Sequence, residues 1–154
     1  MVKIKGSNSI TAITIGEKTS LVKTQEEVIT MIDSILNSVK KKLGILEDYT
    51  HFDEEIILDI NTSFMTLNQL GIGPEEPFMI TGATEIWDDF IEDGRIEAVK
   101  SYIPLKVRLL FDPPQQSFML NSVQDRIAEL EFRMMVQAEK DHLPEYDMGG
   151  IYVK

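Results

Sequence analysis

The chain has 154 residues, of which 43% are hydrophobic, and this is enough for one domain with a real core. It contains no cysteine, which excludes disulfides and thiolate metal sites, and no apolar run of about 18 residues, so we expect no membrane span. The first residues, Met1 to Gly6, lack a signal-peptide core, and we expect an intracellular assembly product.

The net charge of −11 is concentrated in one stretch of the chain. Between Ile45 and Glu97 there are fourteen acidic residues and a single base, Arg95. Binding to phosphates requires Lys and Arg, so a domain this acidic is not expected to hold nucleic acid by its backbone. Three interpretations stay open: a surface that faces DNA without holding it, a surface for a basic partner, or an acidic surface that keeps the protein soluble.

Residues 1 to 23 differ in composition from the rest of the chain. β-branched residues on both sides of Gly16-Glu17-Lys18 predict a β-hairpin, and Val2 and Ile4 are candidates for a third short strand. An isolated hairpin is only marginally stable in water. We therefore expect it to pack on the following helix or on a neighbouring subunit.

A helix is predicted from Thr24 to Leu43. Thr24 opens a capping box, and apolar residues then recur at helical spacing as far as Leu43. Lysines at 40–42 and Gly44 fit the C-terminal end of such a helix. The lysines could contact a phosphate, but cations are ordinary at this end of a helix.

A second helix is predicted to begin at Asp53 and to end at Leu70-Gly71. Its inner face is expected to hold five apolar residues: Ile56, Ile57, Ile60, Phe64 and Leu67. The loop after it contains two prolines and glycines that do not match a phosphate-binding loop. Thr84 is a candidate cap for a short helix over 85–91 in which Trp87 and Phe90 point inward. We interpret Trp87 as a core residue rather than as an interface anchor.

The stretch from Arg95 to Glu139 predicts two long amphipathic helices, separated by Phe111-Asp112-Pro113-Pro114. The first carries apolar residues at steps of three and four: Ile96, Val99, Ile103, Val107 and Leu110. Pro104 lies inside this helix and cannot donate to the Lys100 carbonyl. We expect a kink or a local break near Ser101.

The second long helix has a similar stripe, formed by Leu120, Val123, Ile127, Leu130 and Met134. Phe132, Met135 and Val136 add a second apolar strip to it. The surplus indicates either a helix that is covered on two sides by different neighbours or a helix that is fully buried in the core.

After Lys140 the helical pattern stops, and an extended tail is expected over residues 141–154. The tail contains Tyr146, Ile151, Tyr152 and Val153, and disordered segments are usually poorer in aromatic and β-branched residues. This composition favours docking on a partner, for example as an added strand at the edge of a sheet. A frayed terminus is the alternative.

No catalytic or metal site is predicted, and no cofactor. The two histidines, His51 and His142, are far apart in the sequence, although His51 beside Asp53 could bind a metal weakly. Adjacent carboxylates, such as Glu54-Glu55 and Asp88-Asp89, do not point the same way on a helix. We expect a protein that is not an enzyme, with a hydrolase of unrecognised site as an alternative.

Three stretches of the sequence stand together in a recognisable order and spacing: residues 57–76, 99–114 and 127–139. The most specific of their motifs is Lys106-Val107-Arg108-Leu109-Leu110-Phe111-Asp112-Pro113-Pro114. In these stretches the chain resembles the head–tail connector (adaptor) proteins of long-tailed bacteriophages. The resemblance covers about residues 36 to 140. Pro104 departs from the family pattern, and residues 1 to about 34 look like an addition to it.

With the resemblance, the expected fold is mainly α: a small bundle of about four to five helices with an N-terminal β-hairpin and an extended C-terminal tail. The expected organisation is a hairpin extension over 1–23, a connector domain over 24–140 and a docking tail over 141–154.

The resemblance implies a structural virion protein of the neck, assembled in the host cytoplasm. Such proteins form a ring, commonly dodecameric, under the portal, where it extends the DNA channel and joins the head to the tail or to a stopper protein. The implied partners are the portal, the tail or stopper protein and other copies of the chain, with DNA passing through unbound and no membrane involved.

Three sets of residues then have candidate roles. The tail residues Tyr146, Ile151, Tyr152 and Val153 would bind the portal. Phe132, Met135 and Val136 would form a subunit contact, and Glu75, Glu76, Asp88 and Asp89 would face the channel. The alternative function is a non-enzymatic acidic binding module that sequesters a basic partner.

Overall fold

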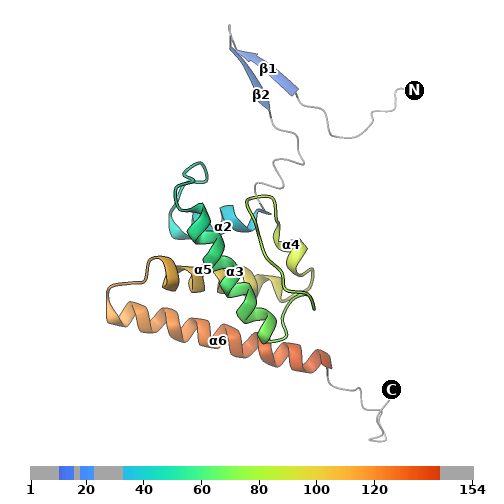
Figure 1. Ribbon diagram of the computed structural model, residues 1–154, viewed down its shortest axis with the longest axis vertical. Helices are drawn as coiled ribbons and strands as arrows, with labels where there is room; N and C mark the ends of the chain where they lie inside the picture. Colours follow the sequence, from blue (N-terminus) through green and yellow to red (C-terminus); the bar gives the residue numbers. More distant parts are fainter. Residues whose placement is uncertain (1–10, 16–17, 23–32, 143–154) are drawn as a thin grey trace, which may run out of the picture.

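The computed structural model describes residues 11–15, 18–22 and 33–142 of the chain (Figure 1). Strands β1 (Thr11–Ile15) and β2 (Lys18–Val22) pair in antiparallel register, with Thr11 opposite Val22 and Ile15 opposite Lys18. Lys18, the last residue of the predicted turn, is the first residue of β2. The rest of that turn, at 16–17, and the candidate third strand at Val2 and Ile4 lie outside the described residues.

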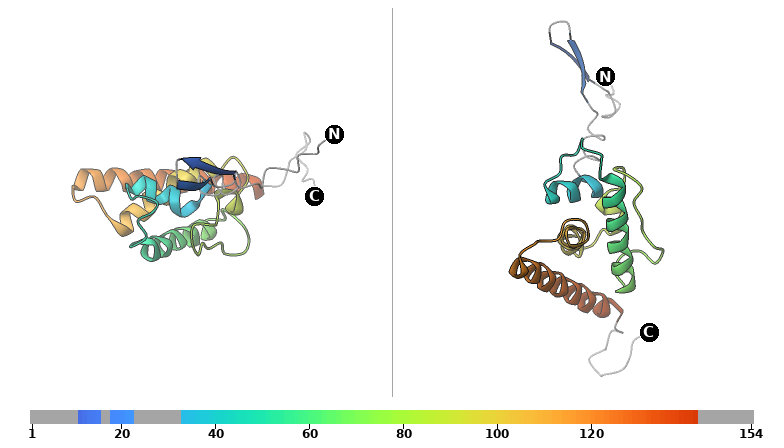
Figure 2. Two further views of the ribbon diagram at one scale, coloured as in Figure 1. Left: turned by 90° about the horizontal axis from the view of Figure 1, so that it is seen from above. Right: turned by 60° about the vertical axis from the view of Figure 1, so that its left-hand side comes forward.

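The region over 33–142 is mainly helical, as the sequence predicts. Its helices are α2 (Ile35–Leu43), α3 (Asp53–Gln69), α4 (Trp87–Phe90), α5 (Ile96–Phe111) and α6 (Ser117–His142). α5 lies at the centre and packs against α2, α3 and α6. The right-hand view of Figure 2 looks nearly along α5, with α2 above it, α3 to its right and α6 below. Among the described helices, none covers the side of α5 between α2 and α6.

α2 begins at Ile35, so the prediction of one continuous helix through Ser34 is wrong. Ser34 has φ −55° and ψ 128°, and its side chain accepts a hydrogen bond from the Asn37 N–H at 3.4 Å. The Ile35 N–H donates to the Glu85 carbonyl at 3.0 Å, and Ser34 forms a β-bridge with Ile86. This pairing with a distant segment interrupts the helical pattern that the sequence carries across Ser34.

α3 begins at Asp53 and ends before Leu70 and Gly71, as predicted. Its inner residues Ile56, Ile60, Phe64 and Leu67 are buried. In the middle of the helix, the buried Asn61 amide fixes the following loop. Its Oδ1 accepts from the Ile80 N–H at 2.8 Å, and its Nδ2 donates to the Ile80 carbonyl at 3.0 Å. Both polar groups of a buried loop residue are thereby satisfied by one side chain.

α4 turns its aromatic residues into the core, as predicted. The Phe90 ring lies 4.6 Å from that of Phe64 between centroids, and the buried Trp87 donates its indole N–H to the Ser38 hydroxyl at 2.9 Å. The predicted cap is wrong, because α4 starts later than Thr84 would require. The Ile86 N–H donates instead to the Asp89 carboxylate at 2.9 Å.

α5 runs without interruption through Pro104. Of the two predicted alternatives near Ser101, a kink or a local break, the break is wrong. A proline inside a helix costs roughly 3 kcal/mol. Val99, Ile103 and Val107 are fully buried around it, and each such burial contributes about 1.5–3 kcal/mol, which outweighs that cost.

The stripe on α5 ends one turn earlier than predicted. Leu110 lies in the last turn of the helix and is 48% exposed, so its assignment to the core is wrong. Tyr102, which the apolar pattern did not include, is fully buried. Its hydroxyl donates to the Glu131 carboxylate on α6 at 2.8 Å, and Lys106 Nζ lies 3.4 Å from the same oxygen. The polar end of Tyr102 thus has a partner, which permits the burial.

α6 packs on α5 through the predicted stripe. Ile127, Leu130 and Met134 are buried. The alternative of a fully buried helix is wrong, because Phe132 on the same helix is 62% exposed. The helix extends to His142, so it includes the first two residues of the predicted tail.

The core also contains a charge that the sequence pattern did not predict. The side chain of Lys40 is fully buried at the end of α2. Its Nζ lies 2.7 Å from Asp53 Oδ1 at the start of α3 and donates to the Glu47 carbonyl at 2.9 Å. Lys40 is therefore a link between α2 and α3 and is not available for a phosphate.

Candidate assembly surface

The four acidic residues predicted to face a channel lie on two adjoining elements. Glu75 and Glu76 are in the loop after α3, and Asp88 and Asp89 are on α4; all four are exposed. The loop lies directly on α4, because a Cβ added to Gly73 would be 2.4 Å from the Phe90 ring. The structure thus places the two elements that carry the acidic pairs in contact with each other.

These carboxylates differ in what they contact. Asp89 caps α4 through the Ile86 N–H, so it also has a local structural role. Within residues 33–142 none of the four forms an ion pair. A group of uncompensated carboxylates repels phosphates at short range, and salt screens the effect beyond about 8 Å at physiological ionic strength.

The second apolar strip of α6 is available for contacts. Phe132 is 62% exposed, and Met135 and Val136 are half-buried. Phe118, near the start of the same helix, is 70% exposed. Large apolar side chains in this number on one helix are typical of a surface that another protein covers.

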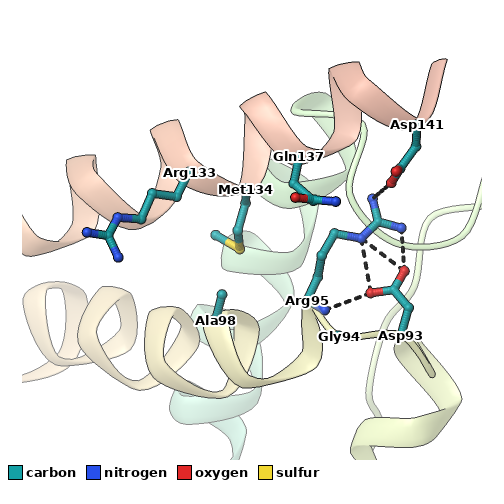
Figure 3. Close-up of a pocket in the computed structure, with 8 residues that line it drawn as sticks. All are labelled: Asp93, Gly94, Arg95, Ala98, Arg133, Met134, Gln137 and Asp141. Atoms are coloured by element: carbon teal, nitrogen blue, oxygen red, sulfur yellow. Dashed lines mark hydrogen bonds and ion pairs between the residues drawn. The ribbon is translucent and has the colours of Figure 1, made fainter. Parts of the chain in front are cut away.

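A pocket of about 580 Å³ lies between the start of α5 and the end of α6 (Figure 3). Arg95 spans it. Its Nε donates to the Asp93 carboxylate at 2.9 Å, and its Nη1 lies 3.4 Å from the Asp141 carboxylate on α6. Hydrogen bonds from the Arg95 side chain hold the pKa of Asp93 below its ordinary value.

This clamp ties the end of α6 to the start of α5. Ala98 and Met134 form the apolar floor of the pocket, and Gln137 and Arg133 stand beside it. Sequence reasoning missed the clamp, although Arg95 is the single base in an acidic stretch and could have indicated it. The predicted docking residues Tyr146, Ile151, Tyr152 and Val153 follow α6 in the chain and lie outside the described residues.

In the described part of the chain, no three His, Cys, Asp or Glu side chains converge to hold a metal ion. His51 is exposed and packs edge-on to Phe52, with ring centroids 4.9 Å apart. Among the described helices, none combines the length and apolar character that crossing a membrane requires.

Comparison with known proteins bears on this five-helix region. A protein-family model described as "Phage connector protein" matches residues 35–141. The chain belongs to the phage connector protein family. The match begins at the first residue of α2 and ends within the last turn of α6, so it coincides with the helical body described above. Comparisons with curated proteins and with solved structures found no match.

Family membership confirms the resemblance found in the sequence, and gives the chain a structural role in connecting the head and the tail of a phage. A connector is a component of the virion that assembles with other head and tail proteins. Residues 1–34 precede the matched region, which agrees with their interpretation as an addition.

Proposed function

We propose that the chain forms a ring beneath the portal, commonly dodecameric in this family, which extends the DNA channel and joins the head to the tail or to a stopper protein. The observation that carries the proposal is the coincidence of the connector match with one five-helix body that has both an exposed apolar strip and a separate acidic surface. A ring subunit needs one surface for its neighbours and another for the lumen.

In this proposal the strip of Phe132, Met135 and Val136 contributes to the contact between subunits. Its support is the exposure of Phe132 on a helix whose opposite side is already packed on α5. The acidic pairs at 75–76 and 88–89 face the channel. Their support is the close packing of the loop on α4 and the lack of ion pairs to them within residues 33–142.

The tail over 141–154 reaches the portal through Tyr146, Ile151, Tyr152 and Val153. The support for this proposal is composition, together with the Arg95–Asp141 clamp, which fixes the helix from which the tail departs. We also propose that the hairpin extension over 1–23 is an appendage to the connector domain over 24–140 and is not part of the body of the ring.

The test is negative-stain microscopy and sedimentation of the full chain, alone and mixed with the portal protein. The expected result is a ring stacked on the portal. Deletion of residues 143–154 should abolish binding to the portal while the circular dichroism of the helical body is kept. A chain that remains solitary with the portal, or that instead binds a basic protein, would refute the proposed ring.

The channel assignment has its own test. Glu75→Lys, Glu76→Lys and Asp88→Lys, combined in one variant, should give the assembled ring measurable and salt-dependent affinity for duplex DNA. Asp89 is left in place because it caps α4. The control variant carries Glu47→Lys, Asp48→Lys and Asp125→Lys, which make the same change of charge at exposed positions outside the two acidic pairs. Equal DNA binding by both variants would contradict the assignment.

A further inference from the structure

The uncovered side of α5 forms a groove. One pocket of about 250 Å³ and another of about 310 Å³ share Lys42, Lys100, Ser101 and Pro104, so they are parts of one depression. The depression follows the side of α5 between α2 and α6, which is free of any helix in the right-hand view of Figure 2. We call it the α5 groove.

The α5 groove is basic, in a chain whose net charge is −11. The cations that line it come from three helices: Lys42, Lys100, Arg108 and Arg126. The single acid in its lining is Glu97, 3.8 Å from Lys100 Nζ. Lys42 and Arg108 form no ion pair within residues 33–142, and Arg126 pairs with Glu129 at 2.7 Å. Two of the four cations therefore have no ion-pair partner among the described residues.

The outer surface of α3 has the opposite character. Leu58 and Met65 are 65% and 56% exposed and lie two turns apart on one side of the helix. Glu55 and Asp59, one turn apart, have no ion pair among the described residues. Burial and the neighbouring Glu55 raise the pKa of Asp59, as expected for like charges at this spacing.

These two surfaces lie on opposite sides of the subunit. α3 packs on α5 with its inner face, so its outer surface points away from α5, whereas the groove opens between α2 and α6 (Figure 2). Complementary surfaces on opposite sides of one chain produce head-to-tail contacts, which close into a ring when the rotation between copies permits.

We propose that the α5 groove of one copy receives the outer face of α3 of a second copy. The cations at Lys100 and Arg108 then lie against Glu55 and Asp59, which relieves the repulsion between these two carboxylates, and Leu58 and Met65 cover the exposed side of α5. The strip at Phe132 does not line the groove and remains available to other contacts. This inference rests on the proposed ring in one respect: the ring is the reason for choosing a second copy of the chain as the partner that fills the groove.

Cysteine cross-linking tests this contact directly, because the natural chain has no cysteine. Thr62→Cys places a thiol on the outer surface of α3, and Ser101→Cys places one in the groove; both positions are exposed. The two variants are mixed in equal amounts, assembled with the portal and treated with a short bismaleimide. The expected product is a dimer of one Thr62→Cys chain and one Ser101→Cys chain, with little cross-linking of either variant alone. Thr50→Cys, at an exposed threonine before α3, replaces Thr62→Cys in the control mixture.

Charge reversal supplies a second readout that does not depend on thiol geometry. Lys100→Glu with Arg108→Glu should weaken self-association at least about tenfold, and Glu55→Lys with Asp59→Lys should do the same. Mixing the two charge-reversed proteins should restore association. Circular dichroism of each variant establishes that the helical body is retained.

The outcomes separate this inference from the proposed function. Rings on the portal without the Thr62–Ser101 product, or without an effect of charge reversal, overturn the contact and leave the ring intact. A chain that never assembles overturns both. A third outcome is that no cross-link forms and the chain binds a duplex DNA probe, with this binding abolished by Lys100→Glu with Arg108→Glu. That outcome would assign the groove to DNA and overturn the contact.

Discussion

Replacing Asp53 by alanine removes the counter-ion of a buried ammonium group. Lys40 Nζ lies 2.7 Å from Asp53 Oδ1, and the Lys40 side chain is fully buried whereas that of Asp53 is 23% exposed. The Glu47 carbonyl is the other hydrogen-bond partner of Lys40, at 2.9 Å. After the substitution, one carbonyl oxygen would be left to compensate a full positive charge in the core.

The size of the effect follows from this geometry. Removing one partner of a buried ion pair costs about 3–5 kcal/mol. Asp53 is partly exposed, so water can replace some of its interaction, and the carbonyl of Glu47 remains. We therefore expect a loss of about 2–3 kcal/mol, a large part of the roughly 5–15 kcal/mol that stabilises a typical domain. Lys40→Met combined with Asp53→Ala removes both charges and should recover most of the loss.

Urea unfolding followed by circular dichroism measures these free energies. The matched control is Glu54→Ala, which removes an exposed carboxylate from the same first turn of α3 and so loses only the helix-dipole interaction, about 0.3–1 kcal/mol. If Asp53→Ala costs no more than Glu54→Ala, or if the double variant is as unstable as Asp53→Ala, then the buried pair does not link α2 to α3 as described.

Two further predictions concern buried polar groups. Burial and the hydrogen bond to the Glu131 carboxylate raise the pKa of Tyr102, so the folded state favours its neutral form. Tyr102 therefore contributes fully to the free energy of unfolding below the ordinary tyrosine pKa of about 10, and this contribution is lost as the pH rises above it. The urea midpoint, measured from neutral to alkaline pH, should fall less steeply in Tyr102→Phe than in the natural chain. Asn61→Ala leaves the buried Ile80 N–H and carbonyl unpaired and should cost about 2–3 kcal/mol; hydrogen exchange at the Ile80 amide should accelerate, whereas exchange at the Ile103 amide in α5 should follow only the global loss of stability.

Local patterns in the sequence were sufficient for the main elements of the body. The start of α3 at Asp53, its end at Leu70 and the central pair of helices were predicted from apolar spacing and from end signals. These features depend on residues only a few positions apart, and the spacing of apolar residues in the sequence indicates such local relations well. The inward direction of Trp87 and Phe90 was predicted for the same reason.

The differences arise where distant segments meet. The pairing of Ser34 with Ile86 interrupts the predicted helix, so that α2 begins only at Ile35, and no residue near Ser34 signals that partner. Lys40 looked like an ordinary cation at the end of a helix, and only the approach of Asp53 makes its burial possible. Pro104 was expected to kink or break α5, but α5 packs against α2, α3 and α6, and this packing is not visible in the local sequence.

The candidate site divides in the same way. The strip at Phe132 and the acidic pairs could be proposed from the sequence, because each set lies on one element or on neighbouring positions of the chain. The α5 groove was missed because its cations come from three helices, and their charges meet only after the helices pack. Lys100 and Arg108, two turns apart on α5, were the available local signal.

The charge distribution finally makes self-association depend on salt in two opposing ways. Each copy carries a net charge of −11, so copies repel one another at long range, and added salt weakens this repulsion. The attraction between Lys100, Arg108 and the carboxylates of a second copy acts at contact, where screening at a Debye length of about 8 Å is incomplete, but it weakens as the Debye length approaches about 3 Å near 1 M salt. Sedimentation velocity of portal-bound and free chain over a salt series should therefore detect a maximum of assembly at intermediate ionic strength. In the variant with Lys100→Glu and Arg108→Glu, assembly should not decline at high salt, because the variant has no electrostatic attraction left to screen at this contact. If assembly of the natural chain instead rises steadily up to 1 M salt, then apolar residues such as Leu58, Met65 and Phe132 drive self-association and the cations of the groove do not contribute to it.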